Sequence, residues 1–357
     1  MATQFLKPLT VAVGAAFLLS GCLTLPDGAE TASVTVSDFN QAIADSRNEQ
    51  ILLNLVRLRY RDTSQFMRVL NVSDAQTYSI EAEAATNLSF IGRALSGVGL
   101  GATASAERKP VVSMSPMDDA EFATALLTPL TTADLALLAS SGWSIERILL
   151  CCVERVGALS NSPRASGPTP AEVPDNAAFR AFAEEVRALQ REEALSLIFD
   201  GERTSLVFFG DGVDVPPALT SQLGVDIVDD RVPLRSVSET GETGVPVQTR
   251  SILGTLYALS HAVDVPPAHA QAGLVTNAYP LSPSTPDWET YLSGAFKVHS
   301  GRERPDSAFV SVFYRGHWFW IDDADLNSKT TFNLVDYLIR LKSASGGAAP
   351  LLTLGLN

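Results

Sequence analysis

The segment that most constrains this chain is its N-terminus, which ends in the run LSGC at Cys22. A single basic residue, Lys7, precedes a short apolar stretch over residues 11–19. A charged start, an apolar core of about ten residues and a cleavage site of small residues form a secretory signal peptide, which is too short to span a membrane as a helix. We therefore expect residues 1–21 to be removed, so that the folded protein begins at Cys22.

A cysteine directly after the predicted cleavage site changes the meaning of this segment. The run resembles the lipobox of bacterial lipoproteins, in which the thiol receives a diacylglycerol and the new N-terminus is acylated, for example with palmitate. Each buried methylene of an acyl chain contributes about 0.8 kcal/mol, so several chains on one residue hold a protein firmly at a membrane. The resemblance implies lipidation at Cys22 and a membrane reached through that lipid. The alternative is an ordinary signal peptide followed by a chance cysteine.

The charge balance of the chain excludes some classes of partner. Its 357 residues include 26 Lys and Arg against 40 Asp and Glu, a formal net charge of −14. Nucleic acids and anionic lipid headgroups are bound through basic patches, so this balance argues against both. Hydrophobic residues make up 46% and charged residues 18% of the chain, which is ordinary for a globular protein with a core.

The two remaining cysteines, Cys151 and Cys152, are adjacent. Neighbouring positions on a helix point about 100° apart, so a disulfide between them would be strained. With Cys22 lipidated, no disulfide framework remains. We expect two small apolar side chains on a half-buried helix over residues 148–156, and a redox pair is the less favoured alternative.

Periodicity and turn residues predict an α+β protein, because the expected strands are not joined by regular helical crossovers. The N-terminal half is expected to be helical with one β-hairpin, and the C-terminal half to hold a mixed, mostly antiparallel sheet with helices. The predicted parts are the signal peptide at 1–21, a tether at 22–36, a helical subdomain at 37–160 with a Gly/Ala-rich hairpin at 66–115, a proline-rich linker at 161–176, and an α+β subdomain at 177–357.

Individual elements follow from the same patterns. Helices are predicted over 38–60, as a cluster over 117–159, and over 175–192, 249–262 and 328–342. Ser115 is expected to cap the first helix of the cluster, Thr131 the second and Ser144 the third. Strands are predicted at 194–199, 203–209, 225–237 and 351–356, and at 308–322 with a tight turn at Arg315 and Gly316.

The predicted hairpin has a period-2 pattern in which Tyr78 and Ile80 alternate with Ser79 and Glu81. A membrane-crossing strand needs about 9–11 residues with one apolar face, so hairpin 78–114 has the length to enter a homo-oligomeric pore. Its second strand is rich in small residues and has a weak apolar face. That weakness favours a hairpin outside the membrane and leaves the pore as an alternative.

Aromatic residues gather in the predicted strand pair at 308–322. Alternation places rings on both faces of these strands. A sheet core with one half-exposed face is the simpler interpretation. The functional interpretation is a surface for a partner or a glycan, because aromatic rings supply contact area at low entropic cost. The candidate surface consists of Phe313, Tyr314, Trp318, Phe319 and Trp320.

Sequence motifs indicate no catalytic, cofactor or metal site. The phosphate-loop, nucleophile-elbow, HExxH and paired CxxC patterns are missing, and the four histidines lack ligand-like spacing. The acidic residues at 322–325 resemble the start of a calcium loop but lack its glycine and its final glutamate, and they suit the N-terminus of the following helix. We expect no cofactor, no metal and no enzymatic activity. A cell-wall hydrolase stays open, because an Asp/Glu pair can act as acid and base without any motif.

Three segments carry a resemblance: NEQILLNLVRLRYRD, LLTPLTTADLALLASSGWSIERIL and FYRGHWFWIDDADLNSKTTF. Together they resemble a family of uncharacterised lipoproteins of Gram-negative bacteria, over most of the mature chain. The family implies a location in the cell envelope and no catalytic residues. Leu23 instead of Asp after the lipidated cysteine resembles the sorting signal for the outer membrane, on its periplasmic face. We thus expect a non-enzymatic interaction or scaffolding module that binds an envelope protein or a second copy of itself, with an oligomeric pore or export assembly as the alternative.

Overall fold

The computed structural model describes residues 36–85, 99–162, 167, 172–173, 175–210, 217–224, 229–239, 243–275, 279–280, 288–292, 294–343 and 351–352. The predicted signal peptide, Cys22, almost the whole tether and much of the predicted linker lie outside these residues. The chain divides into two compact units, Met1–Asp38 with Asp74–Pro110, and Phe39–Ser73 with Val111–Asn357. Within the described ranges, no helix is both long enough and apolar enough to cross a membrane.

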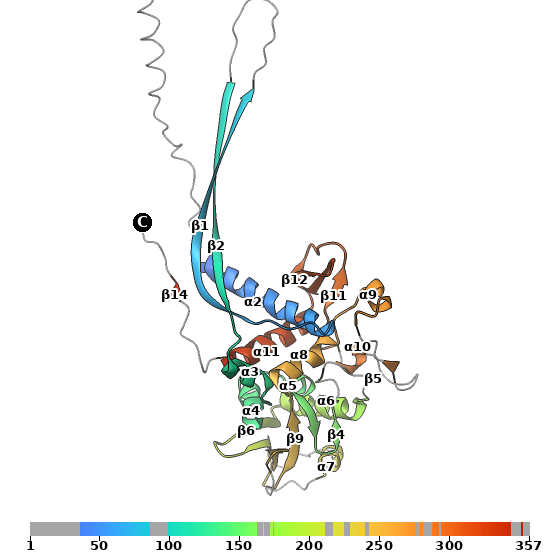
Figure 1. Cartoon of the computed structure of the whole chain (residues 1–357). Coiled ribbons are helices and arrows are strands. Elements are labelled where there is room, and N and C mark those ends of the chain that lie inside the picture. Colours follow the sequence, from blue (N-terminus) through green and yellow to red (C-terminus); the bar gives the residue numbers. More distant parts are fainter. Residues whose placement is uncertain are drawn as a thin grey trace, which may run out of the picture. The chain divides into compact units, whose positions relative to one another are not determined.

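The predicted hairpin is present and its strands are long. Strand β1 is Met67–Ala85, with 19 residues, and β2 is Gly99–Pro116, with 18. At about 3.3 Å per residue, each strand is roughly 60 Å long. The two strands are neighbours in a three-stranded sheet of order β14-β1-β2, in which β14 (Leu351–Leu352) pairs parallel to β1 at Asn71 and Val72 (Figure 1).

A six-stranded sheet lies in the larger unit and has the order β4-β3-β9-β8-β7-β6. Only β8 and β9 pair in parallel, so the sheet is mixed and mostly antiparallel, as predicted. Strands of this one sheet come both before and after residues 161–176, the predicted linker, with α6 (Ala177–Arg191) following the linker directly. The strands are β3 (Val153–Val156), β4 (Leu159–Ser160), β6 (Leu195–Phe199), β7 (Thr204–Phe208), β8 (Arg231–Ser236) and β9 (Val245–Thr249).

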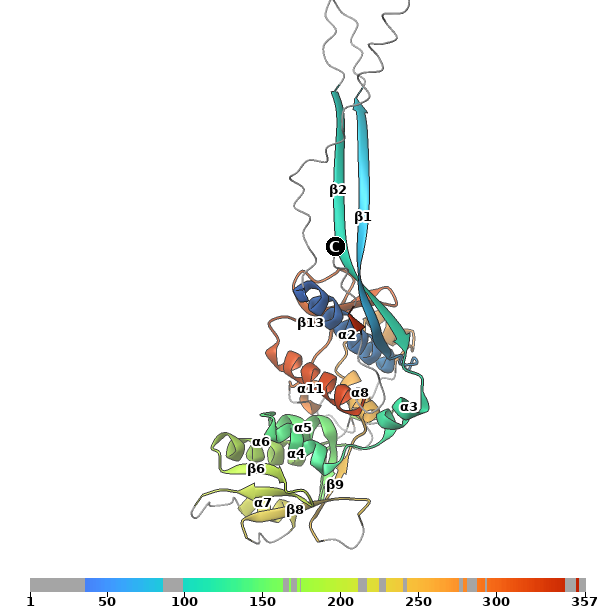
Figure 2. The ribbon, with the colours of Figure 1, turned by 90° about the vertical axis from the view of Figure 1, so that its left-hand side faces the viewer.

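Three helices pack against this sheet (Figure 2): α4 (Thr132–Ser140), α5 (Ile145–Cys152) and α6 (Ala177–Arg191). The helix starts follow the predicted caps, with a capping box between Thr131 and Asp134 and a hydrogen bond from the Arg147 amide to Ser144 Oγ. Apolar side chains of α4, α5, α6 and the sheet then meet in one core, which includes Leu135, Ile148, Phe182, Leu206 and Val247.

A second group of elements in the same unit surrounds α2 (Val36–Arg59). Helix α2 lies beside α11 (Leu326–Ser343), where Arg47 Nη1 and Asp336 Oδ1 are 3.8 Å apart (Figures 1 and 2). Helices α3 (Ala120–Leu127) and α8 (Ile252–Ser260) contact α11. A three-stranded sheet completes the group, with the order β11 (His299–Gly301), β13 (His317–Asp322) and β12 (Ala308–Tyr314). The short elements are α7 (Pro217–Leu223), α9 (Pro267–Gln271), α10 (Trp288–Tyr291), β5 (Glu172–Val173) and β10 (Tyr279–Pro280).

A fully buried arginine links α5 to α10. Arg250 is 1% exposed, and its guanidinium donates to the carbonyl oxygens of Leu150 and Cys151, both at 2.9 Å, and to Tyr291 Oη at 2.8 Å. These carbonyls belong to the last turn of α5, where no further helical turn can satisfy them. A cation near a helix C-terminus is also favoured by the helix dipole. Arg250 therefore terminates α5 from inside the core.

Two local predictions were wrong. The predicted helix over 148–156 ends at Cys152, because Val153 leaves the helical conformation and pairs with Thr249 of β9. Both cysteines are nevertheless buried as expected, and burial raises the pKa of the Cys151 thiol to about 11. Ser115 does not cap a helix, since β2 continues to Pro116 and Asp119 caps α3 instead.

Candidate functional site

The aromatic strand pair turns where the sequence predicts. Tyr314 pairs with His317 across a two-residue loop, and both loop residues have positive φ, 49° at Arg315 and 81° at Gly316. Two consecutive positive φ values define a type I′ turn, whose twist matches that of the flanking strands. Glycine adopts this conformation freely, whereas an arginine at positive φ is strained by about 1 kcal/mol. Contacts of the Arg315 side chain, described below, offset this strain.

Register divides the candidate aromatic residues between two faces of the sheet. Phe313 lies opposite Trp318, and Ser311 opposite Trp320, so these four side chains share the outer face. Val312 lies opposite Phe319 on the inner face, where Phe319 is fully buried. Tyr314 belongs to the inner face as well. The five residues predicted as one surface therefore form two structures with different surroundings.

The inner face packs against the C-terminal end of α2. The amide of Asp62 donates to the carbonyl of Arg57, and the amide of Arg61 donates to that of Leu58. Arg61 has φ of 59°, so these bonds form a Schellman motif with arginine at the left-handed position that glycine usually occupies. This termination brings the Asp62 carboxylate to the turn of the aromatic strands.

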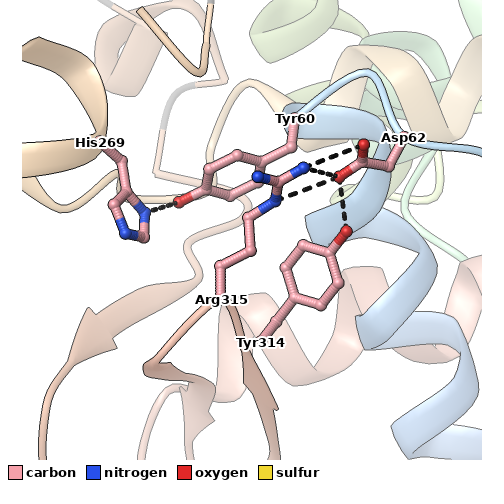
Figure 3. A network of polar contacts seen from close by, with 5 residues as sticks. All are labelled: Tyr60, Asp62, His269, Tyr314 and Arg315. Atoms are coloured by element: carbon pink, nitrogen blue, oxygen red, sulfur yellow. Dashed lines mark hydrogen bonds and ion pairs between the residues drawn. The ribbon is translucent and has the colours of Figure 1, made fainter. Parts of the chain in front are cut away.

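Asp62 accepts hydrogen bonds from Tyr314, the last residue of β12, and from Arg315 in the turn (Figure 3). Arg315 Nη2 donates to its two oxygens at 2.8 and 3.1 Å, and Tyr314 Oη donates to Oδ2 at 2.5 Å. Burial alone would raise the pKa of Asp62, but the hydrogen bonds from Tyr314 and Arg315 outweigh it and hold this pKa below its ordinary value. The guanidinium of Arg315 also lies over the Tyr60 ring, 5.3 Å from its centre. The arginine is thus fixed by one carboxylate and one ring.

Tyr60 extends the network to α9. Its hydroxyl oxygen lies 2.7 Å from His269 Nδ1 (Figure 3). Burial raises the pKa of Tyr60 to about 12, and burial together with the charges of His317 and Arg315 lowers the pKa of His269 below 6.5. Both groups are therefore neutral near pH 7, and the tautomer of His269 decides which of Tyr60 Oη and Nδ1 donates the hydrogen bond between them. The His317 ring stands edge-on to His269 with centroids 4.7 Å apart. The network locks the turn to two distant segments.

The outer face is more open. Phe313 is 57% exposed, and its ring centroid lies 5.4 Å from that of Trp318. The guanidinium of Arg304 lies over the Trp318 ring, 5.2 Å from its centre. Trp320 lies against His299 on the next strand, and a Cβ atom at Gly301 would approach its ring to 3.2 Å. Glycine at this position therefore lets the Trp320 ring approach β11 closely.

An open groove of about 570 Å³ borders this outer face. One wall is a stripe of α2 side chains that includes Glu49, Leu53 and Arg57, and the other is β12 with Trp318 and Arg304. Met67 and Met114, from the ends of β1 and β2 nearest the core, also line it, and all lining residues belong to the larger unit. Burial raises the pKa of Glu49, Asp45 adds to the rise and Arg304 opposes it. Methionine and aromatic linings adapt to varied apolar ligands.

Two of the acidic residues that resemble a calcium loop interact with the start of α11. Asp325 Oδ1 accepts from the Ser328 amide at 3.0 Å, and Asp323 Oδ1 pairs with Lys329 Nζ at 2.6 Å. Across the described residues, no group of three or more His, Cys, Asp or Glu side chains is arranged to hold a metal ion.

Sequence patterns located the aromatic strand pair but missed its supports. Tyr60, Asp62 and His269 had no individual signal, since their partners lie more than 200 residues away. The resemblance segments offered one hint, because Tyr60 and Asp62 end the first and Tyr314 and Arg315 lie at the start of the third.

Lipidation at Cys22 stays a prediction. Comparisons with protein-family models, curated proteins and solved structures find no match to this chain.

Proposed function

We propose that this protein is a lipid-anchored, non-enzymatic interaction module of the cell envelope that binds a protein partner through its outer aromatic face. The outer aromatic face is defined as Phe313, Trp318 and Trp320 with Arg304. The observation that carries the proposal is the exposure of Phe313 beside a Trp318 ring already covered by an arginine. Aromatic and arginine side chains dominate the energetics of protein interfaces.

Preorganisation distinguishes this face from other exposed rings. Tyr337 on α11 is 55% exposed and also lies under an arginine, Arg340, at 5.7 Å. It stands on a single helix. Phe313 and Trp318, in contrast, lie on paired strands whose turn is fixed by Asp62. A surface that is already rigid loses less conformational entropy when a partner binds.

The anchoring part of the proposal rests on the sequence. The signal peptide, the lipobox and Leu23 support a lipid on Cys22 at the periplasmic face of the outer membrane. The resemblance to Gram-negative lipoproteins supports the same location. In this proposal the lipid confines the outer aromatic face near the membrane, which raises its effective concentration toward other envelope proteins.

Crosslinking in the native envelope tests this function. The full lipidated chain is expressed with Phe313→Ala and Trp318→Ala, and its crosslinked envelope proteins are compared with those of the unaltered chain. The matched control is Tyr337→Ala, which removes an equally exposed ring under an arginine. We expect loss of specific crosslinks in the chain that carries Phe313→Ala and Trp318→Ala, and no loss in the Tyr337→Ala control. Retention of every crosslink in that variant contradicts the binding surface.

A second candidate function is a subunit of an oligomeric envelope pore or export assembly that uses hairpin 78–114. The observation that favours it is the length of β1 and β2, 19 and 18 residues, where about 9–11 suffice to cross a membrane. Alternation of Tyr78 and Ile80 with Ser79 and Glu81 in the sequence agrees with one apolar face.

Conductance separates the two candidates. The lipidated protein is added to planar bilayers, alone and with residues 78–114 deleted. A pore predicts an oligomer in detergent and a conductance that the deletion abolishes. A strictly monomeric protein whose hairpin is cut freely by protease contradicts it.

A further inference from the structure

Strand β12 is an open edge of its sheet. The order β11-β13-β12 leaves β12 with one neighbour. In a hairpin closed by a two-residue turn, the residues flanking the turn exchange both ladder hydrogen bonds, and the bonding then alternates along the strand. Tyr314 and Val312 are therefore bonded to β13, whereas the amide and carbonyl groups of Phe313 and Ser311 point away from it. No other part of the described chain supplies a hydrogen bond to those groups.

The groove follows this open edge. Its lining includes Ser311, Val312 and Phe313, three consecutive residues of β12. Consecutive strand residues point to opposite faces, so a groove that touches all three runs along the backbone edge and not over one face. Across the groove stands the α2 stripe. The groove has a volume of about 570 Å³, which lies within the range of volumes of ligand-binding sites.

The charges in the groove favour an anionic occupant. Arg57 lines the α2 wall and Arg304 lines the sheet wall. Within the residues that the structure describes, neither guanidinium lies within ion-pair distance of a carboxylate, whereas Arg315 and Arg340 each have one. The opposing charge is Glu49, whose pKa is raised by burial and by Asp45 and is lowered by Arg304. Two unpaired cations at a strand edge attract carboxylates.

We propose that the groove binds an extended acidic segment of a partner protein, which adds to β12 as a further strand. Backbone hydrogen bonds to Ser311 and Phe313 supply affinity, and acidic side chains reach Arg57 and Arg304. The apolar side chains between them pack on Trp318 and Met114. Strand addition of this kind reads main-chain groups for affinity and alternate side chains for specificity. The inference rests on the proposed binding function and specifies its partner.

The test uses a synthetic probe because no partner is identified. A short fluorescein-labelled peptide of alternating Glu and Val residues is titrated against the full lipidated chain in detergent, with fluorescence anisotropy as the readout. The comparison peptides carry Lys in place of Glu, or N-methyl groups on alternate backbone nitrogens. We expect each change to weaken binding by about tenfold or more, the first through charge and the second through lost main-chain bonds. Equal binding of all three peptides overturns the proposal.

Variants of the protein test the same contacts. Ser311→Pro removes an amide that points into the groove and leaves the ladder to β13 intact, because proline is tolerated at an open strand edge. Arg304→Glu reverses one charge, and Arg302→Glu is its matched control on an exposed residue outside the groove lining. We expect Ser311→Pro and Arg304→Glu to lose peptide binding while Arg302→Glu keeps it. Unchanged binding in the first two overturns the proposal. If Ser311→Pro fails to fold, the N-methylated peptide decides alone.

Failure of this inference is distinguishable from failure of the proposed function. If Phe313→Ala and Trp318→Ala remove envelope crosslinks but the acidic peptide does not bind, the surface binds a folded partner and strand addition is overturned. If those variants retain every crosslink, the binding function itself is contradicted.

Discussion

The two faces of the β11-β13-β12 sheet come from one short run of sequence and differ in almost every physical respect. On the inner face, Phe319 is fully buried and Tyr314 is hydrogen-bonded to Asp62. On the outer face, Phe313 is more than half exposed. Alternation along a strand is the only cause of the separation. The comparison teaches that an aromatic-rich segment is not one structural unit, because neighbouring rings lie in the core and at the surface in turn.

The largest expected contrast is between two phenylalanines of this sheet. Phe319→Ala deletes a fully buried ring that lies 6.2 Å from the Tyr60 ring, and we expect it to lower the free energy of unfolding by about 3–5 kcal/mol. Phe313→Ala on the outer face should cost less than about 1 kcal/mol. Urea unfolding followed by circular dichroism measures both. Similar losses for the two variants would contradict the assignment of faces.

The second prediction compares the loss of the buried Arg250 with the loss of Asp62 from the inner network. Arg250→Met removes the donor to the carbonyls of Leu150 and Cys151 without opening a large cavity. Charged hydrogen bonds to buried acceptors are worth about 1.5–3 kcal/mol, so we expect a loss of about 3 kcal/mol, measured by the same urea titration. Asp62→Asn, at the partly exposed network, should cost only about 1 kcal/mol because solvent screens its ion pair. The reverse order would mean that Asp62 holds the fold more strongly than Arg250.

The inner network should also respond to acid. Because the pKa of His269 is lowered in the folded protein, the unfolded chain takes up this proton first as the pH falls below 6.5. Stability from the neutral His269 is therefore complete above that pH and is lost as the pH falls through the lowered value. Melting temperatures of the unaltered chain and His269→Gln, measured between about pH 5 and pH 8, should differ least at the acid end. A gap that widens in acid would reverse the sign. The lowered pKa of Asp62 predicts a further loss below its ordinary value of 3.8.

The smallest stability effect is expected on the outer face. Arg304→Gln removes the cation over Trp318, an interaction worth about 0.5 kcal/mol at an exposed site. The melting temperature should hardly change, whereas the fluorescence emission of Trp318 should change measurably. Trp318→Phe provides the control, since in its background Arg304→Gln should leave the emission unaltered. A large loss of stability would show that the outer face supports the fold after all.

Local sequence patterns predicted most helices and the aromatic strand pair, and the physical reason is that their signals are local. Gly316 after Arg315 between alternating runs specifies a tight turn whatever surrounds it. Strand β9 was missed because it is short and contains Pro246, which here lies opposite Arg235 in the parallel pairing with β8. Cys152 and Val153 were assigned to one helix because the contacts that end it, with Thr249 and Arg250, come from far along the chain.

Of the candidate site, the sequence predicted only the residues of the aromatic strand pair. The groove needs α2, whose wall residues Glu49 and Arg57 look like ordinary solvated positions of an amphipathic helix. Arg61 at a left-handed position gave no warning, since glycine is the usual signal for such a helix end. Tertiary contacts between distant segments create both features, and a single sequence does not encode them as a pattern.

An open strand edge also has a consequence for the behaviour of the protein at high concentration. Unpaired amide and carbonyl groups on β12 are a template for any extended chain, including an unfolded copy of this one, and natural proteins protect such edges with charges and bulges. Here a register shift lies between Ala308 and Val310, and Arg304 and Glu49 border the groove. These features limit accidental aggregation and leave only the few residues between them, Ser311 to Phe313, available for pairing. The short length of β12 that remains available for pairing therefore limits the length of the segment that can pair with it.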